Sequence, residues 1–397
     1  MNPLVLSSCT ATSAIGRGLD ATLASLRAQR SALVPCAFES VRLDTYVGEV
    51  AGVDAAALPA ALVEFECRNN RLAWLALSQD GFMDTVSHSA ARYGHARVGV
   101  FLGTSTSGIL DSELAYRRRD PVSGALPADF RYRGAHNTFS LAAFVQRALG
   151  LTGPATVISS ACSSSAKVFA SAQRAIATGV VDAAVVGGVD SLCLTTLYGF
   201  HSLQLVSPTP CRPFDAARDG ISIGEAAAFA LLEPSPRSLD AQAVLLLASG
   251  ESSDAYHMSS PPPDGRGARA AMLAALTAAA LEPQDIQYIN FHGTATPSND
   301  AAEAQAVASV FGSGVPGSST KGATGHTLGA AGALEAIICT LALRDGLMPG
   351  GVGTLQVDPA LPVQYLTENR AAPLTRVLSN SFGFGGSNCS LILARAG

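Results

Sequence analysis

A cysteine that follows a short apolar run is the residue best placed for chemistry in this sequence. Residues 155–158 are typical of a buried strand, the chain then turns through small residues, and a helical pattern runs to Gly179. Cys162 therefore falls in the first turn of a predicted helix, where unpaired N–H groups and the helix dipole favour a thiolate. We expect a lowered pKa and a nucleophilic sulfur. The alternative is a small buried apolar residue, as most intracellular cysteines are.

Three further loops carry residue types that are unusual for simple connections. His292 leaves an apolar strand in NFHGTATPSND, and Lys321 and His326 lie in the glycine-rich stretch STKGATGHTLGAAG. An aromatic turn, NSFGFGGSN, follows near the end of the chain. Taken singly, each has a structural interpretation, and neither glycine-rich loop matches a nucleotide-binding pattern. Together, one thiol and two histidines on small-residue loops indicate nucleophilic catalysis.

These motifs resemble those of the condensing enzymes called β-ketoacyl-[acyl carrier protein] synthases. The matching stretches are ACSSS around Cys162, HGTAT around His292, K-x-x-x-x-H from Lys321 to His326, NSFGFGGSN, CRPFDAARDG and the pair Gly224–Glu225. Their order and spacing agree through nearly the whole chain. The resemblance implies a thiolase-like α/β fold with five αβαβα layers made of two duplicated halves. It also implies a dimer whose interface borders the acyl pocket.

The same resemblance implies a reaction and its partner. Cys162 accepts an acyl chain from the phosphopantetheine of an acyl carrier protein, and a malonyl-carrier loses CO₂ and attacks the resulting thioester. The product is a β-ketoacyl chain that is longer by two carbons, as in fatty-acid, polyketide or aryl-polyene biosynthesis. We expect no cofactor and no metal, because the substrates travel on the carrier's own arm.

Roles for individual residues follow from the charge that develops in such a reaction. Decarboxylation places negative charge on the malonyl thioester oxygen, which N–H groups of His292 and His326 suit. Backbone N–H groups of Cys162 and Phe384 suit the tetrahedral oxyanions of acyl transfer. We expect Lys321 to orient His326 and to favour its neutral form, because a nearby cation disfavours imidazolium.

The resemblance assigns supporting residues, each with a simpler alternative. Phe384, together with Phe382 and Phe200, is expected to gate the pocket. Glu335 is expected to pair with Lys321, although an exposed helix carboxylate is the alternative. Thr294 and Thr296 resemble the hydroxyls that bind the pantetheine arm, although they could equally cap a turn. Asn299–Asp300 replaces the family's usual Gly-Asp, so we expect a different loop shape there.

An acidic carrier protein requires basic residues near the pocket mouth. Arg68, Arg71 and residues 117–119, all arginine, are the candidates, and a solvated charged face is the alternative for each.

Composition limits the remaining possibilities. The 397 residues are 48% hydrophobic and 14% charged, which favours a layered α/β fold. The formal net charge of −5 gives no general attraction to nucleic acid. The eight cysteines lack any C-x-x-C pair, which argues against a zinc site or a disulfide framework. We predict a cytoplasmic protein, because no signal peptide or membrane span is visible.

The chain is predicted to divide near residues 234–240, where turn-forming residues separate two long apolar strands. This gives an N-terminal half, 1–239, which carries Cys162, and a C-terminal half, 240–397, which carries both histidines and Lys321. The halves share a strand followed by a small-residue loop and a small-residue-rich helix, which indicates an internal duplication. We also predict a strand at 3–7 and one helix over 71–93.

Other functions fit parts of the pattern. A thiolase or starter-unit synthase would share the fold, but K-x-x-x-x-H favours the elongating type. A chain-length-determining partner subunit would lack the nucleophile, and an acyl-binding module would form no adduct on Cys162. The stretches SACSSSAKVFASAQ and LCLTTLYGFHSLQLVSP resemble synthases of specialised pathways such as those of aryl polyenes, which often pair with a related subunit. A homodimer and a heterodimer both remain open.

Overall fold

Two sets of strands, one from each half of the chain, build the centre of the molecule. The computed structural model describes residues 2–396. In the N-terminal half the order is β1 (Leu4–Ser13), β9 (Ala226–Pro234), β7 (Ala183–Asp190), β5 (Val98–Gly103) and β6 (Ala155–Ile158). In the C-terminal half it is β10 (Val244–Ser253), β17 (Ser387–Arg395), β16 (Arg376–Gly383), β11 (Tyr288–Asn290), β12 (Pro316–Ser318) and β14 (Gln364–Tyr365).

The two sets meet along β1 and β10. These strands pair antiparallel at Leu4 with Leu246 and at Val5 with Leu245, which joins both sets into one sheet. The short strand β2 (Gly16–Arg17) pairs with β1 outside this order and is the twelfth strand. Within each half, the strands that precede the functional loops run parallel: β5 with β6 and β7, and β11 with β12 and β16. Their carboxyl ends therefore lie at one edge of each half.

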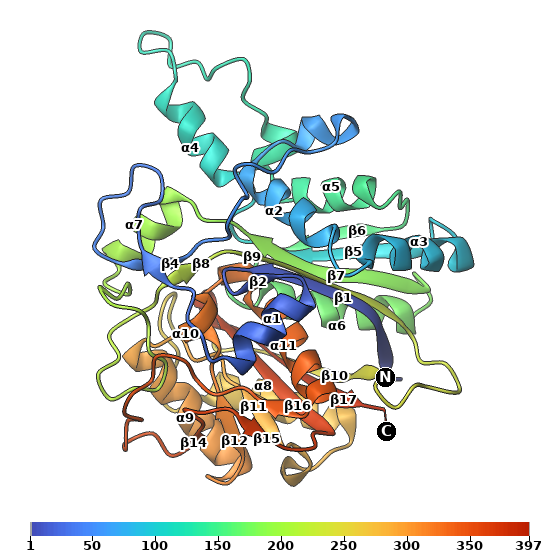
Figure 1. Ribbon diagram of the computed structural model, residues 1–397, viewed down its shortest axis with the longest axis vertical. Coiled ribbons are helices and arrows are strands. Elements are labelled where there is room, and N and C mark those ends of the chain that lie inside the picture. The colour runs from blue at the N-terminus through green and yellow to red at the C-terminus, as the bar shows by residue number, and fades with distance from the viewer. Residues whose placement is uncertain (1, 397) are drawn as a thin grey trace.

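Helices fill three layers around and between the strands (Figure 1). The central layer holds α6 (Ser164–Ala177), α11 (Ala331–Asp345) and α1 (Leu19–Arg27). The helices α2 (Arg68–Leu77), α3 (Phe82–Tyr93) and α5 (Ser140–Ala148) cover the outer face of the first set, and α8 (Arg266–Ala279) and α9 (Pro297–Phe311) cover that of the second. The predicted five-layer αβαβα arrangement is confirmed.

Burial explains why these segments take this form. The residues of β7, AAVVGGVD, are buried throughout, as expected for a strand with helices on both faces. The first 13 residues of α11 are likewise all buried, because this helix lies between the two sets of strands. Gly332 allows α11 to approach α6, since a Cβ there would lie 2.7 Å from the backbone nitrogen of Ala166.

Smaller elements complete the fold. They are β2 (Gly16–Arg17), β3 (Val34–Pro35), β4 (Tyr46–Gly48), β8 (Ile223–Gly224), β13 (Leu347–Met348), β15 (Arg370–Ala371), α4 (Ile109–Arg117), α7 (Leu194–Ser202), α10 (Lys321–Thr324) and 3₁₀ or π turns at 60–65, 132–136, 283–285, 328–330 and 384–386. The helix α4 and the loop after it project from the body (Figure 1). Within residues 2–396, no helix combines the length and the apolar composition needed to cross a membrane.

Two predicted elements differ from the structure. The helix predicted over 71–93 is two helices, α2 and α3, because Asp80 and Gly81 adopt positive φ angles of 56° and 64°. The carboxylate of Asp80 accepts the backbone N–H of Leu19, so this break also caps α1. The first strand extends to Ser13 rather than Ser7. The predicted division at 234–240 begins at the last residue of β9 and otherwise lies in the connection to β10.

Candidate active site

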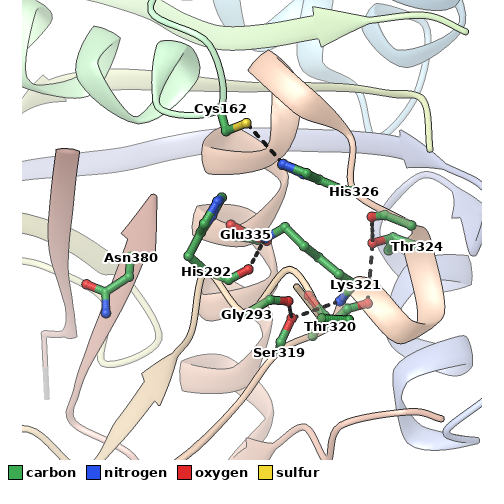
Figure 2. A network of polar contacts seen from close by, with 12 residues as sticks. Cys162, His292, Gly293, Ser319, Thr320, Lys321, Thr324, His326, Glu335 and Asn380 are labelled. Atoms are coloured by element: carbon green, nitrogen blue, oxygen red, sulfur yellow. Dashed lines mark hydrogen bonds and ion pairs between the residues drawn. The ribbon is translucent and has the colours of Figure 1, made fainter. Parts of the chain in front are cut away.

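Loops from both halves converge on one point. Cys162 follows β6, His292 follows β11, Lys321 and His326 follow β12, and Phe384 follows β16. Because the carboxyl ends of parallel strands share an edge, residues far apart in sequence meet where the edges of the two halves face each other. Figure 2 shows Cys162 approaching from one half and both histidines from the other.

The turn before Cys162 is strained and tightly packed. Ala161 has a φ of 53°, a conformation that side chains other than glycine rarely adopt. The hydroxyl of Ser164 accepts the N–H of Ser160 at 2.9 Å, which holds the turn closed. The helix α6 begins at Ser164, so Cys162 lies just before the helix rather than in its first turn as predicted.

The thiol and the two imidazoles form a compact buried group. The Nε2 atom of His326 lies 3.0 Å from the Sγ atom of Cys162. The His292 and His326 rings stack edge to face with centroids 5.3 Å apart and an interplanar angle of 82°. Cys162, His292 and His326 are only 4%, 1% and 2% exposed. The three predicted reactive side chains are therefore brought together. The thiol comes from the N-terminal half and both imidazoles come from the C-terminal half.

Burial decides the charge of this group. It raises the pKa of the Cys162 thiol to about 12, against the opposing effects of Lys321 and a hydrogen bond from the Phe384 N–H. Burial and the Lys321 ammonium lower the pKa of His292 and of His326 well below the usual value. The expectation of a lowered pKa for Cys162 is wrong for this closed site, because desolvation outweighs the helix terminus. Thiol and imidazoles are all neutral at pH 7.

Lys321 and Glu335 form a buried ion pair beneath the histidines. Both side chains are nearly inaccessible, and Lys321 Nζ contacts a Glu335 carboxylate oxygen. The alternative interpretation, in which Glu335 is a solvent-exposed helix carboxylate, is therefore wrong. Lys321 Nζ also donates to the backbone carbonyl of His292 at 2.5 Å (Figure 2). Lys321 thus contacts His292 rather than the predicted partner, His326. Its charge lowers the pKa of His326 without a direct contact.

A further buried residue, not identified from the sequence, binds the backbone at His292 and Gly293. The carboxylate of Glu303, on α9, accepts the N–H groups of His292 at 2.8 Å and Gly293 at 2.7 Å. Asn380 donates to the same carboxylate at 3.1 Å. Burial raises the pKa of Glu303 to about 7. Nothing local marks Glu303 in the sequence, because a glutamate in an alanine-rich helix is usually solvent-exposed.

The buried group lies at the base of a pocket with about 600 Å³ of empty space, including its open mouth. Thr294 and Thr296 line it, and their hydroxyls are 2.9 Å apart. The ring centroids of Phe200 and Phe384 are 5.5 Å apart, and those of Phe382 and His292 are 5.9 Å apart. The remaining lining residues include Leu205, Ile221, Asp254, His257, Ser259, Ser260, Pro261, Ser298, Asn299 and Asn388.

The unusual Asn299 lies in the first turn of α9 and lines this pocket. Its side-chain amide donates to Asp300 at 3.1 Å, and Asp300 in turn accepts the backbone N–H of Phe214 at 2.8 Å. The chain thus places an amide side chain in the pocket wall.

The predicted carrier contacts at the start of α2 are not a free basic surface. Arg68 is 4% exposed and binds Glu225, Asp54 and Glu49, so the prediction that it contacts a partner is wrong. Arg71 is partly exposed but pairs with Glu66. Arg68 points inward because the fully buried carboxylate of Glu225 needs a cation. The arginines at 117–119 lie at the exposed end of α4.

The donor atoms of the buried group could also hold one cation. The Sγ atom of Cys162 and one nitrogen from each histidine lie within 4.8 Å of one another. Among residues 2–396 this is the one cluster of three or more such ligands. Thiolate and imidazole donors suit soft divalent metals such as zinc.

Family models match most of the chain. A model described as "Beta-ketoacyl synthase, N-terminal domain" matches residues 59–238, and one described as "Beta-ketoacyl synthase, C-terminal domain" matches residues 243–354. A mitochondrial 3-oxoacyl-[acyl-carrier-protein] synthase of Arabidopsis thaliana is 38% identical over 62% of this chain and 57% of its own length. The 3-oxoacyl-[acyl-carrier-protein] synthase 2 of Staphylococcus aureus is 32% identical over 75% of each chain.

Solved structures extend this similarity to the whole fold. One chain of the complex of a ketosynthase (ApeO) with its chain length factor (ApeC), from Xenorhabdus doucetiae, is 39% identical to this chain with a TM-score of 0.90. That alignment covers 100% of this chain and 98% of the other. A beta-ketoacyl synthase from Burkholderia phymatum is 31% identical with a TM-score of 0.87, and the alignment covers 100% of both chains.

Proposed function

The chain belongs to the beta-ketoacyl synthase family, and we propose that it extends an acyl chain held on Cys162 by decarboxylative condensation with malonyl-acyl carrier protein. The observation that carries this proposal is the 3.0 Å approach of His326 Nε2 to Cys162 Sγ beside His292, at the base of a pocket. The reaction needs a nucleophile and two uncharged N–H donors at one point. This arrangement supplies all three.

In the first step Cys162 takes the acyl chain. Its sulfur attacks the acyl carbonyl carbon, a new C–S bond forms, and the bond to the pantetheine sulfur breaks. The thiol proton ends on the departing pantetheine sulfur. Backbone N–H groups of Cys162 and Phe384 stabilise the tetrahedral oxyanion, and the hydrogen bond from Phe384 to the Cys162 sulfur supports this placement.

In the second step malonyl-carrier loses CO₂. The electrons of the broken C–C bond form an enolate whose charge lies on the thioester oxygen. N–H groups of His292 and His326 stabilise this oxygen, and one such donor is typically worth about 3 kcal/mol. The enolate carbon then attacks the acyl carbon on Cys162, the C–S bond breaks, and the Cys162 thiolate that leaves takes a proton from solvent. The β-ketoacyl product stays on the carrier.

The pocket above these residues suits the arm that delivers both substrates. We assign Thr294 and Thr296 to the pantetheine, because their hydroxyls line the pocket and are bonded only to each other and to the backbone within their own turn. Phe384, Phe382 and Phe200 form the aromatic gate above Cys162. No step needs a cofactor or a metal, since both thioesters arrive already activated.

We further propose a two-subunit assembly in a specialised pathway of the aryl-polyene type. The similarity to a ketosynthase solved together with its chain length factor supports a related partner, and a homodimer is the alternative. The strand β6 ends the order of the strands, and its residues are partly exposed, so it can pair with a second subunit. The presence of Cys162 favours the catalytic subunit. A cytoplasmic location remains a prediction.

Mass spectrometry of the purified protein tests the nucleophile. After incubation with an acyl-carrier protein we expect an acyl adduct on Cys162, and a Cys162→Ala variant forms none. Adding malonyl-carrier to the acylated protein yields a product longer by two carbons, and a panel of acyl-carriers reveals the preferred length.

Cys339→Ala is the matched control, because Cys339 is equally buried but lies in the middle of α11. We expect near-normal turnover from it. Equal loss of turnover in both variants would refute the assignment. A wild-type protein that binds acyl chains without forming a covalent adduct would indicate an acyl-binding module instead.

A further inference from the structure

The three reactive side chains are also a set of donors that a transition metal prefers. Their ligand atoms, the Sγ of Cys162 and one ring nitrogen each of His292 and His326, all lie within 4.8 Å of one another. The Sγ atom and the Nε2 atom of His326 are 3.0 Å apart. Zinc binds thiolate at about 2.3 Å and imidazole at about 2.0–2.1 Å, so a tetrahedral ion places such donors about 3.3–3.6 Å apart. Shifts of roughly 1 Å bring the three atoms to those distances.

An ion can reach this group from solvent. Cys162, His292 and His326 all line the open pocket described above, so a metal held by them keeps one coordination position toward the pocket for water. The backbone of both histidines is already fixed. The His326 N–H donates to the Ser222 carbonyl at 2.7 Å, and the Glu303 carboxylate accepts the His292 N–H at 2.8 Å. A group of ligands ordered in advance loses less conformational entropy on binding.

The surroundings favour a reversible site over a resident one. Within residues 2–396, the Nδ1 atoms of His292 and His326 are buried and have no hydrogen-bond partner. A histidine that holds a resident metal usually donates its other ring N–H to a carboxylate or carbonyl, and loss of that partner costs about 10- to 100-fold in affinity. The Lys321 ammonium below the rings opposes a second cation, although the paired Glu335 carboxylate offsets part of its charge. We therefore expect the metal to bind and leave.

We propose that Cys162, His292 and His326 form a reversible inhibitory site for Zn²⁺, and that zinc and an acyl chain exclude each other there. When zinc binds, the S–H bond of Cys162 breaks, the proton leaves to solvent, and the sulfur electron pair forms the bond to the metal. Each ring nitrogen that binds zinc has no N–H to offer, so the donors for the enolate are lost as well. The inhibition rests on the proposed function, whereas the metal site does not.

Cobalt binding to the full chain tests the site without any measurement of activity. Tetrahedral Co²⁺ absorbs visible light, and a thiolate ligand adds a charge-transfer band in the near ultraviolet. We expect both features for the wild type in buffer free of thiols and chelators, and we expect Zn²⁺ to remove them. Cys162→Ala should abolish the charge-transfer band and raise the zinc Kd about a hundredfold or more, because loss of a ligand costs at least as much as loss of its outer partner.

Cys339→Ala is again the matched control, because Cys339 is buried as Cys162 is but lies in α11, outside the group of ligands. We expect its cobalt spectrum and its zinc Kd to equal those of the wild type. Acylated wild-type protein provides a second test in which no residue is changed. With an acyl chain on Cys162 the zinc Kd should rise about as far as in Cys162→Ala. Zinc added first should prevent the acyl adduct, and EDTA should restore it.

Two results would overturn the metal site. One is a zinc Kd for Cys162→Ala equal to that of the wild type, and the other is a cobalt spectrum without the charge-transfer band. Zinc binding that leaves acylation unchanged would overturn the mutual exclusion. A wild-type cobalt spectrum with that band, together with no acyl adduct in metal-free protein, would support the metal site and remove the proposed chemistry.

Discussion

The Cys162 thiol and the two imidazoles share an environment that opposes any charge. Desolvation keeps the proton on Cys162 and keeps it off His292 and His326, and Lys321 adds to the effect on the histidines. A neutral imidazole still offers an N–H, so the site retains donors for the enolate without holding a permanent cation. Burial therefore sets the protonation state in which the histidines work, and the Lys321 ammonium reinforces it.

Removing one histidine tests the donor role. We expect His292→Ala or His326→Ala to slow malonyl decarboxylation roughly a hundredfold or more, because one oxyanion donor is lost. Acylation of Cys162 should survive better, since backbone N–H groups serve that step. Separate assays of CO₂ release and of adduct formation distinguish the two steps. His292→Gln keeps an N–H donor and should retain more activity than His292→Ala, and the reverse order would contradict the role.

Removing the charge of Lys321 tests the protonation state. The lowered pKa of both histidines keeps them neutral as the pH falls below their usual value of about 6.5. In Lys321→Met the ammonium is lost, so the pKa of each histidine rises and they become charged at a higher pH. We expect the acid limb of the kcat profile to move to higher pH, and Lys321→Arg to move it less. An unchanged limb with only a lower plateau would contradict this.

At the scale of elements, a buried carboxylate ties the two halves together near the site. Asp190, at the end of β7, accepts hydrogen bonds from the side chains and backbone of residues 104–106, which follow β5. It also accepts the N–H of Gly329 at 2.6 Å, just before α11. One carboxylate thus joins a loop of the first half to the helix that follows His326.

Replacing this carboxylate should destabilise the fold. In Asp190→Asn one oxygen becomes an NH₂ group that faces N–H donors, which leaves buried groups unsatisfied. We expect a loss of about 3 kcal/mol in the free energy of unfolding, measured with urea, and a lower Tm. Asp182→Asn is the control, because Asp182 is half-exposed and pairs with a surface arginine. Equal effects of both changes would contradict the joining role.

At the scale of the whole molecule, the strand order leaves β6 with one free edge. Its residues are partly exposed although they precede the nucleophile, and an unpaired edge readily adds another strand. A second subunit paired there would lie against the same turn that carries Cys162. Assembly and acyl pocket would then be neighbours.

A charge on this edge tests the assembly. We expect Thr156→Lys to weaken dimerisation, because edge lysines prevent strand pairing. For the proposed two-subunit assembly, analytical ultracentrifugation should detect a dimer in the wild type and monomer in the variant. Val180→Lys, another exposed position, should leave the dimer intact. Dimers that persist in Thr156→Lys would place the interface elsewhere.

The sequence by itself determined which residues meet and which family they belong to. Cys162, His292, Lys321, His326 and Phe384 could be named because their short motifs occur together and resemble, in order and spacing, those of one family of condensing enzymes. The strand pattern likewise predicted layers, since long apolar strands need helices on both faces.

Only the tertiary structure decided the electrostatics and the supporting contacts. The raised pKa of Cys162, the inward turn of Arg68 and the hold of Glu303 on His292 all depend on burial, which depends on residues distant in sequence. A motif specifies side-chain chemistry and local turns. The free energy of charging a group depends on everything packed around it, and that is fixed only when both halves are assembled.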